Sequence, residues 1–210
     1  MVKASAIAVG LIVLVLVVVA FCVFSTKKGD DVALLWRPEG RVVVAFFSQS
    51  KVGNTRQVAE WIAEATGGDV VEIERNEPYP EPYDETLKAA REEMSSGTLP
   101  EIRPVDVNLS DYDIVFIGTP VWYGTYAAPV GSFLKAADLS GKTVIPFCTH
   151  GGGGAGRTFA DIGRAVPSAK VVLSGFAARG SNQVERRFGV GVRRTTCKAD
   201  VVTWLNGFAK

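Results

Sequence analysis

Apolar residues along the chain follow two alternating patterns, short continuous runs and regularly spaced positions. A run of about four to eight apolar residues indicates a strand buried in a parallel sheet, and apolar residues at i, i+3 and i+4 indicate a helix that packs one side on a core. The runs predict five strands, at 42–47, 69–74, 113–118, 142–148 and 170–175. The spaced positions predict a helix after each strand: from about 55, at 84–94, at 129–137, up to about 165, and at 198–208.

This alternation predicts a doubly wound, mostly parallel α/β sheet with helices on both faces. Ligands of such sheets bind outside the carboxyl ends of the strands, where the connecting loops meet. The loops after the first, third and fourth predicted strands all contain residues with unusual chemistry. Because these loops lie at one edge of the sheet, their convergence is the main evidence for a binding site.

The loop after the first strand is small and polar, and it leads directly into a predicted helix. Its notable residues are Ser48, Ser50, Gly53, Asn54 and Thr55. A helix N-terminus offers unpaired N–H groups and a partial positive charge, which favour an anion. Two interpretations fit equally well, a phosphate cradle and an ordinary strand-to-helix turn. The loop matches neither the GxxxxGK[ST] nor the GxGxxG pattern.

The other two loops are suited to a flat ligand. After the third strand, Trp122 and Tyr123 offer aromatic faces for stacking. After the fourth, Gly151–Gly154 removes side chains, so that backbone N–H groups can approach a planar ring. Core packing and a plain flexible loop are the alternatives for each loop taken alone. A ligand with a phosphate and an aromatic ring satisfies all three loops together, which favours a flavin.

The chain resembles the flavodoxin-like FMN-binding family over about residues 41–208. The resemblance is carried by Pro120-Val121-Trp122-Tyr123-Gly124 and by Pro146-Phe147-Cys148-Thr149-His150-Gly151-Gly152. It implies a five-stranded parallel sheet in the order 2-1-3-4-5, with FMN as the cofactor. It also implies thirteen cofactor-binding residues: Ser48, Ser50, Gly53, Asn54, Thr55, Pro120, Trp122, Tyr123, Gly124, Thr149, His150, Gly151 and Gly152.

The resemblance leaves several roles open. The first loop is two residues longer than the compact S-x-T-G-N-T form, so either Ser48 or Ser50 could reach the phosphate. Either aromatic residue of the second loop could cover the ring, and a carbonyl at Gly124, with Tyr123, is the candidate to face flavin N5. His150 has two expected environments, a partly exposed loop position or the pyrimidine edge of the ring, where it would titrate near neutral pH.

The N-terminus predicts a membrane anchor. Ala4–Phe24 contains 21 uncharged residues, enough for a helix to cross the ~30 Å hydrocarbon core of a bilayer. A cleaved secretory signal is the alternative, but the run is longer than usual and lacks an A-x-A site. We therefore predict an anchor at 1–28, a linker at 29–40 and an FMN-binding domain at 41–210. One lysine precedes the span and two follow it, so the flanking charges hardly determine its orientation.

A cluster of basic residues gives weak evidence for the side of the membrane on which the domain lies. It is either a solvated face or a site of attraction to anionic lipid head groups, which would place the domain on the cytoplasmic side. Its members are Arg186, Arg187, Arg193, Arg194 and Lys198.

The composition of the chain argues against several classes of function. All 22 acidic residues and 20 of the 23 basic ones follow residue 28, a net charge of −2, which gives no indication of nucleic-acid binding. Three cysteines and one histidine predict neither a disulfide framework nor a metal site. Three functions remain: a membrane-anchored carrier that transfers electrons between redox partner proteins, an NAD(P)H-dependent quinone reductase, and a flavin-free binding module. The three loops argue against the last.

Overall fold

The computed structural model describes residues 32–50, 53–180 and 196–209. The chain divides into two units, Met1–Ala33 and Leu34–Lys210, and the second contains the α/β domain. The anchor predicted at Ala4–Phe24 and the stretch Ser181–Arg194 lie outside the described residues, so the anchor stays a prediction. Within the described ranges, no helix has the length and apolar character needed to span a bilayer.

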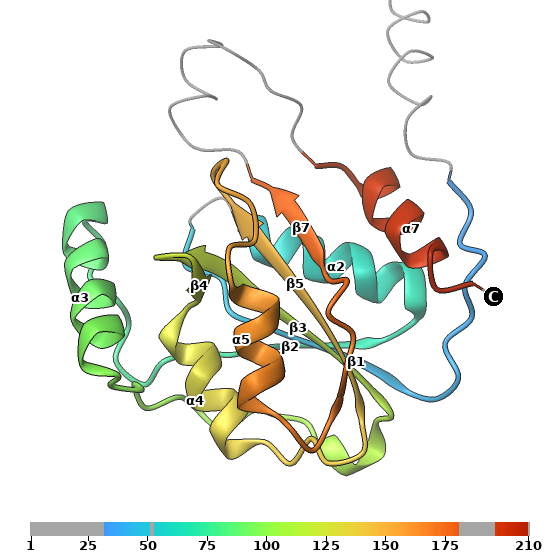
Figure 1. Ribbon diagram of the computed structural model, residues 1–210, viewed down its shortest axis with the longest axis horizontal. Helices are drawn as coiled ribbons and strands as arrows, with labels where there is room; N and C mark the ends of the chain where they lie inside the picture. The colour runs from blue at the N-terminus through green and yellow to red at the C-terminus, as the bar shows by residue number, and fades with distance from the viewer. Residues whose placement is uncertain (1–31, 51–52, 181–195, 210) are drawn as a thin grey trace, which may run out of the picture. The chain divides into compact units, whose positions relative to one another are not determined.

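A twisted sheet forms the centre of the domain (Figure 1). Its main path is β2-β1-β3-β5-β6, and every neighbouring pair on that path is parallel. This is the order 2-1-3-4-5 expected for the five strands found in the sequence. The bounds on this path are Asp69–Glu72 (β2), Val42–Phe46 (β1), Ile114–Trp122 (β3), Thr143–His150 (β5) and Lys170–Val171 (β6). The predicted number of strands is wrong, because β4 (Thr125–Tyr126) and β7 (Phe176–Arg179) bring the total to seven.

Only the first two residues of the fifth strand predicted at 170–175 form a strand, β6, and a further strand, β7, begins directly after the predicted range; both pair with β5. The break stands opposite Pro146, which has no N–H to donate to a ladder. Val172 donates to the carbonyl of Val144 at 2.9 Å, so the backbone of Pro146, two residues further along β5, faces the same side. A Cβ on Gly175 would overlap the carbonyl oxygen of Pro146. The edge chain therefore bulges here and resumes as β7.

The third strand is longer than predicted. β3 continues past Gly118 to Trp122 and turns into the antiparallel β4, with Trp122 paired to Thr125. The two residues between them have left-handed backbone, at φ 48° for Tyr123 and φ 82° for Gly124. Positive φ at both positions is typical of a type I′ hairpin turn. The aromatic pair thus lies at a rigid hairpin tip and not in an open loop.

Helices cover both faces of the sheet, as predicted (Figure 1). One face is buried by α2 (Asn54–Thr66) and α7 (Lys198–Asn206), and the other by α4 (Ala128–Ala136) and α5 (Thr158–Ala165). α3 (Tyr83–Ser96) stands beside α4 and buries only Thr86 and Ala90 of its own residues. Because α3 has so little apolar contact, polar links decide how it is held.

Two helices begin at unusual N-cap residues. α3 begins one residue before Asp84, with Pro82 at the N-cap, and Asp84 lies in the first turn, where its charge complements the helix dipole. α7 is capped by Cys197. The N–H of Cys197 donates to the side chain of Asp200 at 2.9 Å, which forms a capping box with an unusual residue at the cap.

Candidate functional site

Two hydrogen bonds bring the three loops together at the carboxyl edge of the sheet. The hydroxyls of Thr55 and Thr149 lie 2.8 Å apart and are buried, which joins the start of α2 to the end of β5. The N–H of Arg157 donates to the carbonyl of Gly124 at 2.7 Å, which joins the β3–β4 turn to the segment before α5. The convergence expected from the sequence is therefore built into the fold.

The two serines of the first loop have different environments. The hydroxyl of Ser50 accepts from the N–H of Asn54 at 3.2 Å, so Ser50 serves as a local cap for α2. Gly53, at the N-cap, has left-handed backbone (φ 69°). The hydroxyl of Ser48 is buried and has no hydrogen-bond partner among the described residues. A buried unpaired hydroxyl costs about 1–3 kcal/mol, so Ser48 is the serine whose bonding capacity is open to a ligand.

The aromatic pair at the hairpin tip is held from two sides. The ring of Trp122 packs edge-on against Phe47 and Tyr79, at centroid distances of 5.7 and 5.1 Å. Tyr123 is 46% exposed, and its hydroxyl donates to the carbonyl of Leu87 in α3 at 2.9 Å. The orientation of the tryptophan is therefore set by the core, and that of the tyrosine by α3.

The carbonyl predicted to face flavin N5 accepts one hydrogen bond within the protein. Gly124 accepts from Arg157, as described above, so its oxygen ties the hairpin tip to α5. The tip contains one more carbonyl at the same turn, that of Tyr123. Pro120, two residues before Trp122, lies on β3 and pairs with Thr149 of β5. Gly124 therefore also holds the loop, and because a carbonyl oxygen has two lone pairs, its role toward a flavin stays a prediction.

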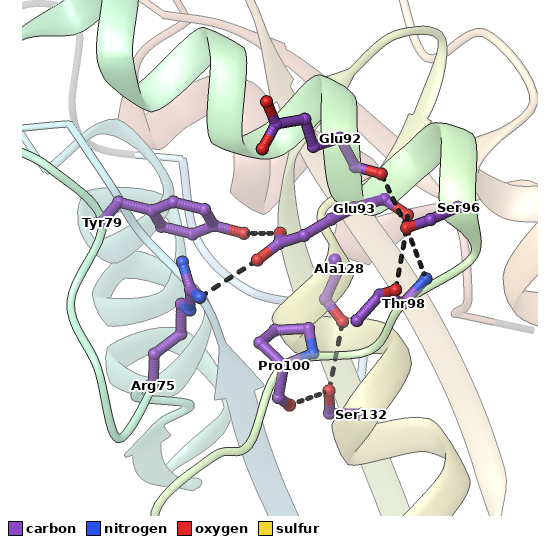
Figure 2. Close-up of polar contacts among 9 residues, drawn as sticks. All are labelled: Arg75, Tyr79, Glu92, Glu93, Ser96, Thr98, Pro100, Ala128 and Ser132. Carbon is purple, nitrogen blue, oxygen red and sulfur yellow. Dashed lines mark hydrogen bonds and ion pairs between the residues drawn. The ribbon is translucent and has the colours of Figure 1, made fainter.

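A mostly buried polar cluster joins Arg75, Tyr79 and Glu93, and the sequence did not indicate it (Figure 2). The carboxylate of Glu93, on α3, pairs with the guanidinium of Arg75 at 3.0 Å and accepts a hydrogen bond from the hydroxyl of Tyr79. The guanidinium also lies 3.8 Å from the centroid of the Tyr79 ring. Burial, and then the neighbouring Glu93, raise the pKa of Tyr79, so the phenol stays protonated and donates. The cluster thus links α3 to the ring on which Trp122 packs.

The glycine loop is folded around His150. The Nδ1 atom of His150 accepts from the N–H groups of Gly152 and Gly154, at 3.0 and 3.2 Å. Burial, and then the positive charge of Arg179, lower the pKa of the imidazole. His150 is half-buried and is the last residue of β5, and its place at the edge of a flavin ring stays a prediction. A Cβ on any residue of Gly151–Gly154 would meet open space, so the outer side of the loop is accessible to a ligand.

A hollow of about 210 Å³ adjoins the loops that follow β1 and β5. Asn54 and Thr149 line it together with residues of α2, β7 and the start of α7. The side chain of Asn54 also lies against the backbone of Gly180, where a Cβ would overlap it. Arg179 and Cys197 reach this hollow as well, and nothing in their sequence context marked them as neighbours of the site.

The buried threonine pair provides a test of the local geometry. Replacing Thr55 by valine leaves the hydroxyl of Thr149 buried without its partner, and we expect a loss of about 1–3 kcal/mol in the free energy of unfolding. Thr149→Val should cost a similar amount. The double variant should cost less than the sum of the two, because it leaves no unpaired hydroxyl. Urea unfolding of the four proteins measures the coupling, and strictly additive losses would contradict the contact.

Comparisons with known proteins agree on one family. The flavodoxin family model matches residues 41–185. A protein of Bacteroides eggerthii, provisionally named a flavoprotein, is 26% identical, covers 82% of this chain and 99% of its own, and has a TM-score of 0.65. A similarly named protein of Bacteroides uniformis is 27% identical, with coverages of 70% and 95% and a TM-score of 0.61. A flavoprotein of Lactobacillus acidophilus in complex with FMN is 24% identical, with coverages of 70% and 98% and a TM-score of 0.56. No curated protein matches the chain.

Proposed function

Because the chain belongs to the flavodoxin family, we propose that it binds FMN where the loops after β1, β3 and β5 meet, and that it transfers electrons there between redox partner proteins. FMN is the cofactor that family membership gives to this chain. When bound, FMN supplies the redox chemistry, and the protein binds, orients and tunes it. We also propose that Ala4–Phe24 attaches the protein to a membrane with the domain on the cytoplasmic side, on the strength of the sequence alone.

The observation that carries the FMN assignment is the buried hydroxyl of Ser48, in the loop between β1 and α2, which has no hydrogen-bond partner among the described residues. A phosphate oxygen accepts from a hydroxyl and from the first-turn N–H groups of a helix, which have no acceptor within the helix. Asn54 adds a side-chain amide at the same point. The hydroxyl of Thr55 was expected to contact the phosphate, but it is hydrogen-bonded to Thr149. We therefore assign the contact with the anion to the backbone of Thr55.

The other two loops have complementary roles. Trp122 and Tyr123 would border the flat face of the ring, and the carbonyls of Tyr123 and Gly124 are the candidates to accept a hydrogen bond from it. Gly151–Gly154 has an open outer side that a ring edge could fill without a steric clash. Together these residues bind the phosphate, orient the ring and limit the access of water to it.

The two serines give a matched test. We expect Ser48→Ala to weaken FMN binding about tenfold or more, because a hydrogen bond to a charged phosphate is worth about 1.5–3 kcal/mol. Ser50→Ala makes the same chemical change two residues away and should mainly weaken the cap of α2. FMN titration of the purified full chain in detergent, followed by absorption and fluorescence, measures both. If Ser48→Ala binds FMN as tightly as wild type, the phosphate assignment fails; if wild type binds no FMN, the proposed function fails.

The same preparation separates the carrier from the reductase. A carrier should be reduced in two resolved one-electron steps and should oxidise NADH or NADPH negligibly. Steady oxidation of NAD(P)H in the presence of a quinone would instead favour an NAD(P)H-dependent quinone reductase. Stepwise reduction under anaerobic conditions, monitored by absorption, distinguishes the two.

A further inference from the structure

We propose that His150 is a positioning residue: its neutral imidazole, protonated on Nε2, holds the N–H groups of Gly152 and Gly154 and so sets the shape of the glycine loop beside the FMN site. The clamp itself is independent of the proposed function. Only its consequence for FMN affinity rests on that function.

The geometry explains why the loop needs such a clamp. Four successive glycines have no side chains to restrain them, and glycine loses more conformational freedom on folding than any other residue. Two members of the loop have backbone that favours glycine, at φ 140° for Gly152 and φ 75° for Gly154. Both donate to one nitrogen of His150. A single side chain thus turns a flexible run into a defined loop.

The imidazole is itself fixed by the sheet. His150 is the last residue of β5 and pairs in register with Arg179 of β7. Its carbonyl accepts from the N–H of Gly180 at 3.0 Å. The residue before it is Thr149, whose hydroxyl contacts Thr55 in the first loop. The clamp is therefore continuous with the contact that joins the glycine loop to the start of α2.

The clamp requires an unprotonated Nδ1, because a protonated nitrogen cannot accept from the two amides. The charged group that faces the imidazole is Arg179, from β7. β3 presents Pro120 and Val121 at this level, both uncharged, and Arg157 at the far end of the loop is paired with Asp161. Burial and Arg179 both disfavour the imidazolium, and the two amides add to that preference.

The sign of the pH effect follows directly. The pKa of His150 in the folded protein is lower than its ordinary value of 6.5, so the neutral form is favoured by folding. The stabilisation from the clamp is complete at pH values above 6.5. It is lost as the pH falls through the pKa of the folded state, and the loop should open over that range.

Histidine NMR tests the clamp without FMN. The chain contains one histidine, so selective ¹⁵N-histidine labelling of the full chain in detergent micelles gives a single pair of ring nitrogens, and a second sample labelled with ¹⁵N-glycine reports the loop amides. We expect the Nε2–H tautomer, a titration below pH 6.5, and amide shifts of Gly152 and Gly154 that follow the same titration. The Nδ1–H tautomer, or glycine amides that do not respond to the histidine titration, would overturn the proposal.

Two substitutions test the consequence for FMN. In His150→Asn the side-chain oxygen takes the place of Nδ1 and accepts at any pH, whereas His150→Ala removes the acceptor. We expect the alanine variant to weaken FMN binding about tenfold at pH 7.5, from the loss of loop order, and the asparagine variant to restore most of the affinity. Wild-type affinity should fall as the pH is lowered from 7.5 through the histidine titration that NMR records, while that of the asparagine variant should not.

The results separate the two ideas. If asparagine is no better than alanine, or if wild-type affinity does not decline across the histidine titration recorded by NMR, His150 does not position the loop for FMN and the proposal is overturned. If the NMR signature is present but wild type binds no FMN at any pH, the clamp stands and the proposed function fails.

Discussion

Replacing Glu93 by alanine is expected to lower the free energy of unfolding by about 3 kcal/mol, because Arg75 then loses its counter-charge at a position mostly shielded from water. The side chain of Glu93 is 12% exposed and that of Arg75 is 15% exposed, so water replaces the lost carboxylate poorly. The phenol of Tyr79 also loses its acceptor. Since α3 buries little else, the substitution removes its main attachment to the domain.

Glu92→Ala is the matched control for this substitution. Glu92 is the preceding residue on the same helix, and it is exposed (Figure 2). Its replacement should change the stability by no more than about 0.5 kcal/mol. Urea unfolding of wild type and both variants gives the comparison. Equal losses for the two variants would show that the cluster of Arg75, Tyr79 and Glu93 does not hold α3. We also expect Glu93→Ala to weaken FMN binding, because Tyr79 supports Trp122.

Replacing Gly156 by alanine is the second change with a large expected effect, also about 3 kcal/mol in the free energy of unfolding. The left-handed backbone at this position, φ 56°, costs a non-glycine residue about 1–2 kcal/mol. The new methyl group would also overlap the carbonyl of Gly124, and such overpacking costs about 1–3 kcal/mol. That overlap pushes the hairpin tip away from α5 and breaks the contact between Gly124 and Arg157.

Gly151→Ala makes the same chemical change in the same loop and is the control. Its backbone is not left-handed, and the added methyl group meets nothing within 4 Å. We expect it to leave the stability within about 0.5 kcal/mol of wild type. Thermal unfolding of both variants tests the comparison, and FMN titration of Gly156→Ala against wild type should show a lower affinity because Tyr123 is displaced. A Gly156→Ala protein as stable as Gly151→Ala would contradict the close approach of the two loops.

The apolar pattern determined the layout of this domain before any contact was known. Runs such as Val42–Phe47 indicate strands buried on both faces, because neither face of such a strand has polar side chains that could contact water. Alternation with helices implies parallel strands, and parallel strands place their loops at one edge. The two helix layers and the convergence of the three loops therefore followed from this pattern, whereas the sheet order was implied by the resemblance to the flavodoxin-like family. The same pattern could not locate the split between β6 and β7, because the missing donor belongs to Pro146 on a different strand.

The details of the site were decided by tertiary structure. Ser48 and Ser50 are chemically identical in the sequence, and only the fold makes one a helix cap and leaves the other unpaired. The ion pair of Arg75 with Glu93, and the bond between Thr55 and Thr149, join residues from separate elements. Periodicity describes how each residue faces its own element, whereas these contacts depend on how the elements pack. The sequence therefore determined where a ligand could bind, and the packing decided which side chains are free to hold it.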